Sequence, residues 1–349
     1  NYGVSFADAV SGQVTVSEST FAPLYHSVVF WGALTNAAVA LAGVAAGGAQ
    51  GIAFDASVTG GKIAIRGGSV TVNSAVGIEF KGDVAGVDAS VTGTTVTAAC
   101  AGACVAIVFQ GALTGGTRVA VADVTLGGTG SPLTGLKFGA ATDSDIAVRG
   151  GSVTADSGIV FNGALTNTAV ALTDADVGGG QFGVTFPDAA GGSIAVTGGT
   201  LRGTANAVLF QSLTGTPVTV AGTAVAATGP TGAAFRFGSG TPITGASPVR
   251  FSRVAVGGGV IQDGISFGSA ITNGDVSVSD STFAVQFSGV IFHGALTDTA
   301  VALSSVDVTS GYGFTVTGAA SGGSMRARVL ASGSGAAASA SVWCWKGWA

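Results

Sequence analysis

FWGALTNAAVAL, at residues 30–41, returns as FNGALTNTAVAL at residues 161–172 and as FHGALTDTAVAL at residues 292–303. Each copy starts 131 residues after the one before it. A chain that repeats itself at fixed intervals is built from one structural unit, which buries its apolar face by stacking on further copies. The sequence therefore predicts a solenoid.

A shorter period lies inside the long one, and it is marked by an aliphatic residue, any residue and then Phe. Successive marks are 23 to 30 residues apart, which indicates about 13 coils of about 25 residues whose turns accept insertions. We expect these Phe side chains to point inward and to stack along the axis. They are Phe6, Phe30, Phe54, Phe80, Phe109, Phe138, Phe161, Phe186, Phe210, Phe237, Phe267 and Phe292, with Val316 in the place of a thirteenth.

Within each coil, apolar residues alternate with polar or small ones, as in strands with one face in a core. Ile78 and Phe80 flank Glu79, and similar runs follow a few residues later, as at residues 63–65 and 69–72. Three short strands per coil predict an all-β, right-handed parallel β-helix. A leucine-rich repeat, a left-handed hexapeptide helix and a calcium-binding nonapeptide array fit less well, because their signatures are missing from the sequence.

The longer repeat corresponds to five coils, of which the sequence holds about two and a half sets. We expect residues 1–330 to form a single solenoid domain, and residues 331–349 to form a low-complexity tail with a Trp-rich end. Residues 1–6 already match the first strand of a coil, so the sequence resembles a window on a longer array.

Composition excludes some classes of partner. The net charge is −5, and the 13 Lys and Arg residues are scattered, so nucleic acid is not expected as a partner. The uncharged stretch at residues 22–53 has a high mean hydropathy but strand-and-turn spacing, and we expect no membrane span.

Residues for catalysis are sparse. Glu occurs only at Glu18 and Glu79, His only at His26 and His293, and most Asp residues sit in predicted turns. The closest carboxylate groupings are Asp174 with Asp176, Asp143 with Asp145, and Asp275 with Asp280. Spacing of i, i+2 on a strand puts two side chains on one face, so Asp174 and Asp176 could hold a cation or act as a pair, or only cap their own turn. Polysaccharide-cleaving β-helices need clustered carboxylates, so we expect no catalytic residues, no metal site and no cofactor.

The outward row of the first strand carries aliphatic residues at intervals. Apolar positions repeated down one side of a solenoid favour a lateral contact face, although scattered exposed aliphatics are also common. The candidate face consists of Val29, Val108, Val160, Leu209 and Ile291.

Open ends of a solenoid present unpaired strands and core side chains, which recruit further strands. We expect self-association, head-to-tail or within a longer chain, through contacts at Tyr2, Val4, Phe6, Trp343, Trp345 and Trp348. Cys100 and Cys104 fall in a long coil, where a turn could join them as a disulfide or leave two free thiols.

The Val-, Thr-, Gly- and Ala-rich coil phrases resemble the repetitive β-helix regions of large secreted and cell-surface proteins, and more loosely the dispersed gene family surface proteins of trypanosomatids. The resemblance implies an extracellular structural or adhesive role without a catalytic centre. We expect a rod-like segment of a surface fibre or filament, and the alternative is a β-helix that binds or cleaves carbohydrate, with glycan as the partner.

Overall fold

The structure is a computed structural model that describes residues 2–23, 25–129, 132–230, 232–238, 242–245, 247–257, 261–309, 312–332 and 341–346. Its strands belong to two compact units, Asn1–Gly180 and Gln181–Ala349. Each unit is a stack of coils made of β-strands, and no helix occurs among the described residues. The predicted fold class, a parallel β-solenoid, is confirmed, with about 12 turns.

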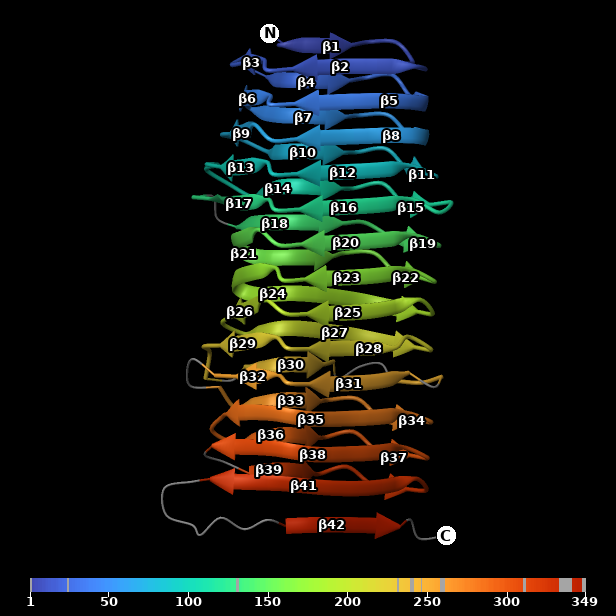
Figure 1. Cartoon of the computed structure of the whole chain (residues 1–349), viewed down its shortest axis with the longest axis vertical. Coiled ribbons are helices and arrows are strands. Elements are labelled where there is room, and N and C mark those ends of the chain that lie inside the picture. Colours follow the sequence, from blue (N-terminus) through green and yellow to red (C-terminus); the bar gives the residue numbers. More distant parts are fainter. Residues whose placement is uncertain are drawn as a thin grey trace. The chain divides into compact units, whose positions relative to one another are not determined.

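In the first unit, each coil has a first, a second and a third strand, and strands of one kind lie one above another (Figure 1). The first strands are β1 (Val4–Phe6), β4 (His26–Phe30), β7 (Gln50–Phe54), β10 (Val76–Phe80), β14 (Cys104–Phe109), β18 (Leu133–Phe138) and the end of β21 (Ser152–Phe161). The second strands are β2 (Gln13–Ser17), β5 (Leu34–Ala42), β8 (Val58–Arg66), β12 (Asp88–Thr92), β16 (Arg118–Ala122), β20 (Asp145–Arg149) and β23 (Ala169–Thr173). The third strands are β3 (Thr20–Phe21), β6 (Ala45–Gly48), β9 (Ser69–Val72), β13 (Thr95–Ala98), β17 (Thr125–Gly128) and the start of β21; short corner strands are β11 (Val84–Ala85), β15 (Leu113–Thr114), β19 (Ala141–Thr142) and β22 (Leu165–Thr166).

The second unit repeats this plan, and β24 (Asp176–Ala190) contains the boundary between the units. First strands after it are β27 (Asn206–Thr214), β30 (Ala233–Phe237), β33 (Asp263–Phe267), β36 (Ser288–Phe292) and β39 (Tyr312–Val316). Second and third strands are β25 (Ser193–Thr197), β26 (Thr200–Gly203), β28 (Val218–Ala221), β29 (Ala224–Ala227), β31 (Pro248–Ser252) and β32 (Ala255–Val256), and then the merged β35 (Asp275–Ala284), β38 (Ala300–Thr309) and β41 (Ser324–Ser332). The corner strands β34 (Ile271–Thr272), β37 (Leu296–Thr297) and β40 (Ala320–Ser321) form a small sheet of their own.

Parallel pairing in strict register brings the core Phe of each coil over that of the next. In the first unit, Ile78, Glu79 and Phe80 pair with Ile52, Ala53 and Phe54. The rings from Phe6 to Phe161 stack with centroids 4.4 to 5.4 Å apart, and in the second unit those from Phe186 to Phe292 do so at 4.5 to 5.0 Å. Except for Phe6, these rings are at most 2% exposed. The predicted inward Phe ladder is confirmed, and burial of each ring contributes about 2–3 kcal/mol.

The corners explain where Gly, Asn and Asp fall in the sequence. The residue after the corner dipeptide Leu-Thr, or its equivalent, has a positive φ in every coil of the first unit from Asn36 (50°) through Gly60 (65°) to Asn167 (49°). Only Gly, Asn and Asp adopt this left-handed conformation readily. Asp174 sits at the other corner with φ of 51°, so it cannot share a strand face with Asp176 in the way that the i, i+2 spacing suggested.

At the other end of the sequence, β42 (Ser341–Lys346) pairs antiparallel with β41. Its Trp343 and Trp345 are the backbone partners of Ala327 and Met325. Trp348 lies outside the described residues, as does part of the predicted tail. No helix among the described residues is both long and apolar enough to cross a membrane.

Candidate functional site

The outward face of the second strands in the first unit combines a small-residue floor with long polar side chains on both sides. The register places Ala40, Ala64, Ser90, Ala120 and Ala147 in one central column. Because the floor is almost flat, side chains in the flanking columns rise above it and enclose a groove along the coil axis.

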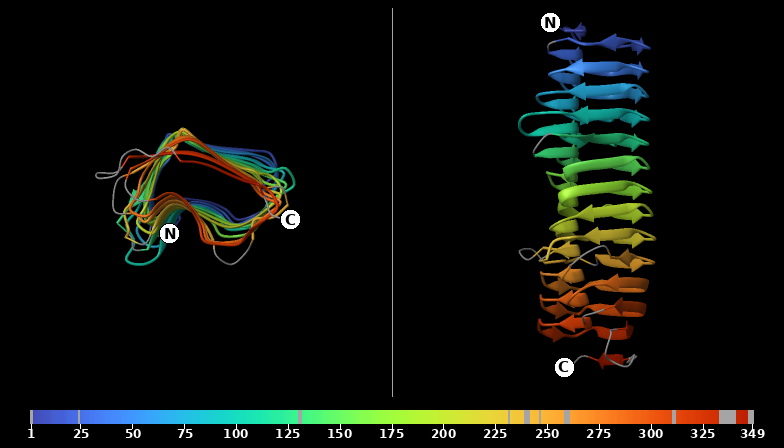
Figure 2. Two further views of the ribbon diagram at one scale, coloured as in Figure 1. Left: turned by 90° about the horizontal axis from the view of Figure 1, so that it is seen from below. Right: turned by 90° about the vertical axis from the view of Figure 1, so that its left-hand side faces the viewer.

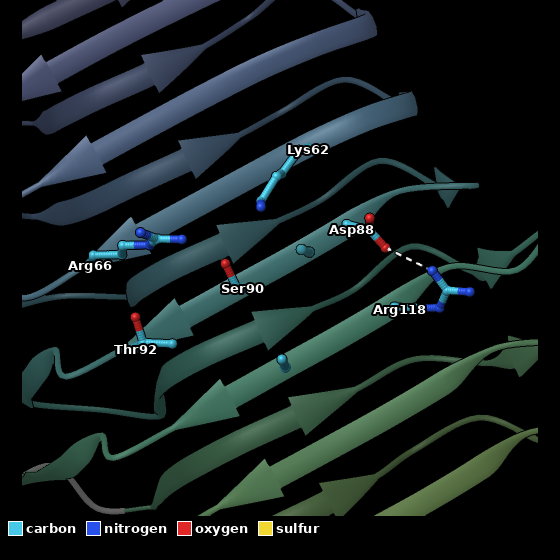
Figure 3. Close-up of a pocket in the computed structure, with 8 residues that line it drawn as sticks. Lys62, Arg66, Asp88, Ser90, Thr92 and Arg118 are labelled. Carbon is cyan, nitrogen blue, oxygen red and sulfur yellow. Dashed lines mark ion pairs between the residues drawn. The ribbon is translucent and has the colours of Figure 1, made fainter.

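One hollow of this groove has a volume of about 610 Å³ and lies over β8, β12 and β16. Its polar lining consists of Lys62, Arg66, Asp88, Ser90, Thr92 and Arg118. Figure 3 shows Lys62, Asp88 and Arg118 on one side of the groove and Arg66 and Thr92 on the other, with Ser90 between them. A second hollow of about 260 Å³ shares Lys62 and Arg66 and continues toward β5 and β2, so the groove crosses several coils.

Charge in the groove is predominantly positive. Arg118 is the only cation of the three with an ion pair among the described residues: its Nη1 lies 3.6 Å from Asp88 Oδ1, and its Nε lies 3.9 Å from Asp145 Oδ2. These side chains are 58 to 72% exposed, so each pair contributes roughly 0–1 kcal/mol. Lys62 and Arg66 have no carboxylate partner there, which leaves two fixed cations available to an anion.

Sequence reasoning missed this site because it read the Lys and Arg residues as scattered. Lys62 and Arg66 come from one coil and Arg118 from the second coil after it. Parallel register brings them to one face at a rise of about 4.8 Å per coil. An alignment of the coils on their second strands, instead of on the core Phe residues, would have placed these three cations in the two flanking columns.

The candidate lateral face is less accessible than expected. Val29, Val108 and Ile291 are 0%, 5% and 8% exposed, and Val160 and Leu209 are half-buried. The premise that this row meets water is wrong for the first three. In the end-on view the coils of the first unit are indented on the side where the N-terminus lies (Figure 2). The role of this row in lateral contact stays a prediction.

The predicted end-to-end contacts start from a partly open coil. Tyr2 is 50% exposed, whereas Val4 and Phe6 are half-buried. Phe6 stacks on Phe30 on one side only, at 4.5 Å. Whether these residues bind a second molecule stays a prediction, as it does for the tail residues.

Cys100 and Cys104 are buried free thiols. Burial raises the pKa of Cys100 to about 12, and a hydrogen bond and charge interaction with Cys104 act in the same direction. The two sulfurs are therefore neighbours, as the sequence suggested, in the free-thiol alternative rather than the disulfide.

Carboxylates and histidines do not form a metal cage within the described ranges: no group of three or more His, Cys, Asp or Glu side chains is placed to hold an ion. In the second unit, Asp263 accepts a hydrogen bond from the Ser288 amide at 3.3 Å. Burial raises the pKa of Asp263, and the Ser288 hydrogen bond and the charges of His293 and Arg236 oppose that rise.

No protein-family model and no curated protein sequence matches the chain. A similar solved structure is the A-module of the mannuronan C-5 epimerase AlgE6 from Azotobacter vinelandii, with 13% sequence identity and a TM-score of 0.38. The alignment covers 90% of each of the two chains. A similarity of this size carries no argument about the activity of the present chain, and nothing in these comparisons points to trypanosomatid surface proteins.

Proposed function

We propose that the chain is a non-catalytic, adhesive β-solenoid of the cell surface that binds an acidic polysaccharide along the groove over β8, β12 and β16. The observation that carries the proposal is the pair of cations, Lys62 and Arg66, that have no carboxylate partner in the part of the chain that the structure describes and that line a groove about 610 Å³ in volume. A linear chain of uronate residues offers carboxylates along its length, which suits cations on one coil and again on the second coil after it.

The rigidity of the platform supports this reading. Lys62, Arg66 and Arg118 project from strands that are hydrogen-bonded on both sides, so little backbone entropy is lost on binding. Their exposure makes each contact weak and sensitive to salt. Such a surface holds a polymer by many modest contacts at once, which is how an adhesive surface works.

The groove itself is poorly equipped for bond cleavage. Its lining contains a single carboxylate, Asp88, and that group is ion-paired with Arg118. Hydrolysis of a glycosidic bond requires two carboxyl groups on opposite sides of the scissile bond. We therefore expect the bound polymer to be released unchanged.

The test is a binding titration of the full chain with polygalacturonate and with a neutral glucan of similar length. The double variant Lys62→Ala, Arg66→Ala should weaken binding of polygalacturonate by roughly 5- to 30-fold, if each lost contact is worth about 0.5–1 kcal/mol. Arg202→Ala, which removes an exposed cation from β26, is the matched control and should leave affinity unchanged.

Equal affinity for the neutral glucan, or equal loss in the control, would sink the proposal. Analysis of the polymer after prolonged incubation tests the non-catalytic part separately. Shortened chains, unsaturated ends or a changed uronate composition would show an enzyme instead.

Head-to-tail assembly into a filament is a second candidate, favoured by coils that offer one another the same parallel register and the same ring contacts. Sedimentation of the chain over a hundredfold concentration range should show a growing species, and Phe6→Asp should abolish that growth. A sedimentation coefficient independent of concentration would exclude head-to-tail assembly.

A further inference from the structure

The two walls of the groove carry charge in different patterns. Strand register places Lys62, Asp88, Arg118 and Asp145 in one flanking column, which forms the first wall. Along this wall the sign of the charge alternates from one coil to the next, and Figure 3 shows its first three side chains on one side of the groove. The two cations, Lys62 and Arg118, are therefore two coils apart, or about 9.6 Å.

The second wall is the other flanking column, which lies four residues further along each strand and about 13 Å away. It consists of Arg66, Thr92, Ala122 and Arg149, so it combines cations with uncharged residues and contains no acid. Arg149 is exposed, and no ion pair joins it to a carboxylate in the part of the chain that the structure describes. Both walls therefore offer positive charge to a ligand.

The charged part of the groove has defined ends. The second strands before it, β2 and β5, and the second strand after it, β23, carry no charged side chain. Charge in the first unit's groove therefore begins with Lys62 and Arg66 on β8 and ends with Arg149 on β20. Three coil steps separate these strands, which is about 14 Å along the axis.

A linear polysaccharide matches this layout when it lies along the coil axis. In an extended 1,4-linked chain, each sugar advances by close to one coil spacing and is turned over relative to the sugar before it. A group carried by every sugar therefore points alternately to the two edges of the chain. Each edge presents that group once in every two sugars, which is the spacing of Lys62 and Arg118 on the first wall.

We propose that the groove binds its acidic polymer parallel to the coil axis, as an extended ribbon with a carboxylate on every sugar and successive carboxylates directed to opposite walls. This inference rests on the proposed function and specifies the polymer. Lys62 and Arg118 bind the carboxylates of one edge; Arg118 has five N–H donors and keeps some free while it is paired with Asp88. On the other edge the carboxylates fall at β12 and β20, where Arg149 meets one directly and Arg66 reaches the other from the adjacent coil.

The same layout discriminates against other acidic polymers. A chain that is acidic at every second sugar directs all its carboxylates to one edge, so it uses the cations of one wall only. A chain with acids on successive sugars of one edge would place a carboxylate opposite Asp88 or Asp145, and like charges repel. In the ribbon, Asp88 and Asp145 instead face sugar hydroxyl groups, which donate hydrogen bonds to a carboxylate.

The experiment compares β-1,4-linked polyglucuronate with hyaluronan by calorimetric titration of the full chain. Polyglucuronate is acidic at every sugar, whereas hyaluronan is acidic at every second sugar. The two polymers are matched in length and titrated at one ionic strength, because salt screens every contact of this kind. Polyglucuronate should bind about 5- to 30-fold more tightly, since it also engages the two cations of the other wall.

Single variants distinguish the two walls. Lys62→Ala and Arg149→Ala should each weaken binding of polyglucuronate by about two- to fivefold, whereas at most one of them should weaken binding of hyaluronan. Arg202→Ala on β26 is the control and should change neither affinity. The affinity of glucuronate oligomers should rise with length to about four sugars, the length that spans β8 to β20, and then level off.

Failure of this inference is distinguishable from failure of the proposed function. If polygalacturonate binds through Lys62 and Arg66 but hyaluronan binds as tightly as polyglucuronate, the two-walled ribbon is wrong and the groove is still a site for acidic polymers. The same conclusion holds if Arg149→Ala leaves the affinity for polyglucuronate unchanged. An affinity that levels off at two sugars would overturn the axial orientation. If no acidic polymer binds, both proposals fail.

Discussion

Removal of one ring from the Phe ladder tests the energetic basis of the fold. Phe54 is 1% exposed and has rings on both sides, Phe30 at 4.9 Å and Phe80 at 4.6 Å. Phe54→Ala loses the free energy gained by transferring the ring from water to the core, and it leaves a cavity. The hydrogen-bonded register of the strands prevents the neighbouring coils from closing that cavity. We expect a loss at the upper end of about 3–5 kcal/mol.

Phe6→Ala is the matched comparison. Phe6 is half-buried and stacks on one side only, so its removal should cost about 1–2 kcal/mol. Guanidinium denaturation followed by circular dichroism gives the difference between the variants. Hydrogen exchange should accompany it, because long repeat arrays depart from two-state unfolding, and should place the lost protection in the coils next to residue 54.

Two results would refute the reasoning. One is a loss for Phe54→Ala below about 1 kcal/mol, which would mean that the stack relaxes around the missing ring. The other is equal destabilisation by Phe6→Ala and Phe54→Ala, which would show that the free energy lost does not depend on how many rings stack on the one removed.

Three further outcomes follow from local features. Asn273 has a φ of 53°, so Asn273→Gly should be tolerated while Asn273→Val should cost about 1–2 kcal/mol, measured by thermal denaturation. Burial raises the pKa of Glu79 above its ordinary value of 4.5, so protonated Glu79 stabilises the fold below pH 4.5 and this contribution is lost as the pH rises. Glu79→Gln should therefore stabilise the protein at pH 7, by about 1.4 kcal/mol for each unit by which the pKa is raised. The same variant should have little effect on stability at pH 4. The Cys100 thiol has a pKa of about 12, so it should resist alkylation at pH 8 in the folded protein and react in guanidinium. Peptide mapping by mass spectrometry measures both reactions, and labelling of Cys100 in the folded protein would place the thiol at the surface.

The sequence predicted the ladder because an apolar residue stands two places before the Phe in each coil, so the period of the core is visible without coordinates. The corners could also be predicted from the sequence, because Asn36 and Asp143 occupy left-handed turn positions that few residue types adopt. Both features depend on residues close together in the chain, or on a repeat that makes distant residues equivalent.

The surface was harder to predict for a physical reason. Burial of Val29 depends on contacts with side chains outside its own strand, which alternation within one strand does not encode. Whether Lys62 has a carboxylate within reach depends on which residue occupies the same column one or two coils away. Insertions between coils shift those residues in the sequence but not in space, so the columns emerge only once the register of each strand is known.

The uniform Phe ladder also bears on how the gene can change in length. A duplication or deletion of one whole coil leaves every remaining ring facing another ring, because each coil offers its neighbours the same contacts from above and below. A change of half a coil would instead place a corner over a strand and put a polar side chain into the core. Tolerated length variants should therefore differ by whole coils, and recombination between near-identical stretches such as 30–41 and 161–172 supplies five coils in a single step.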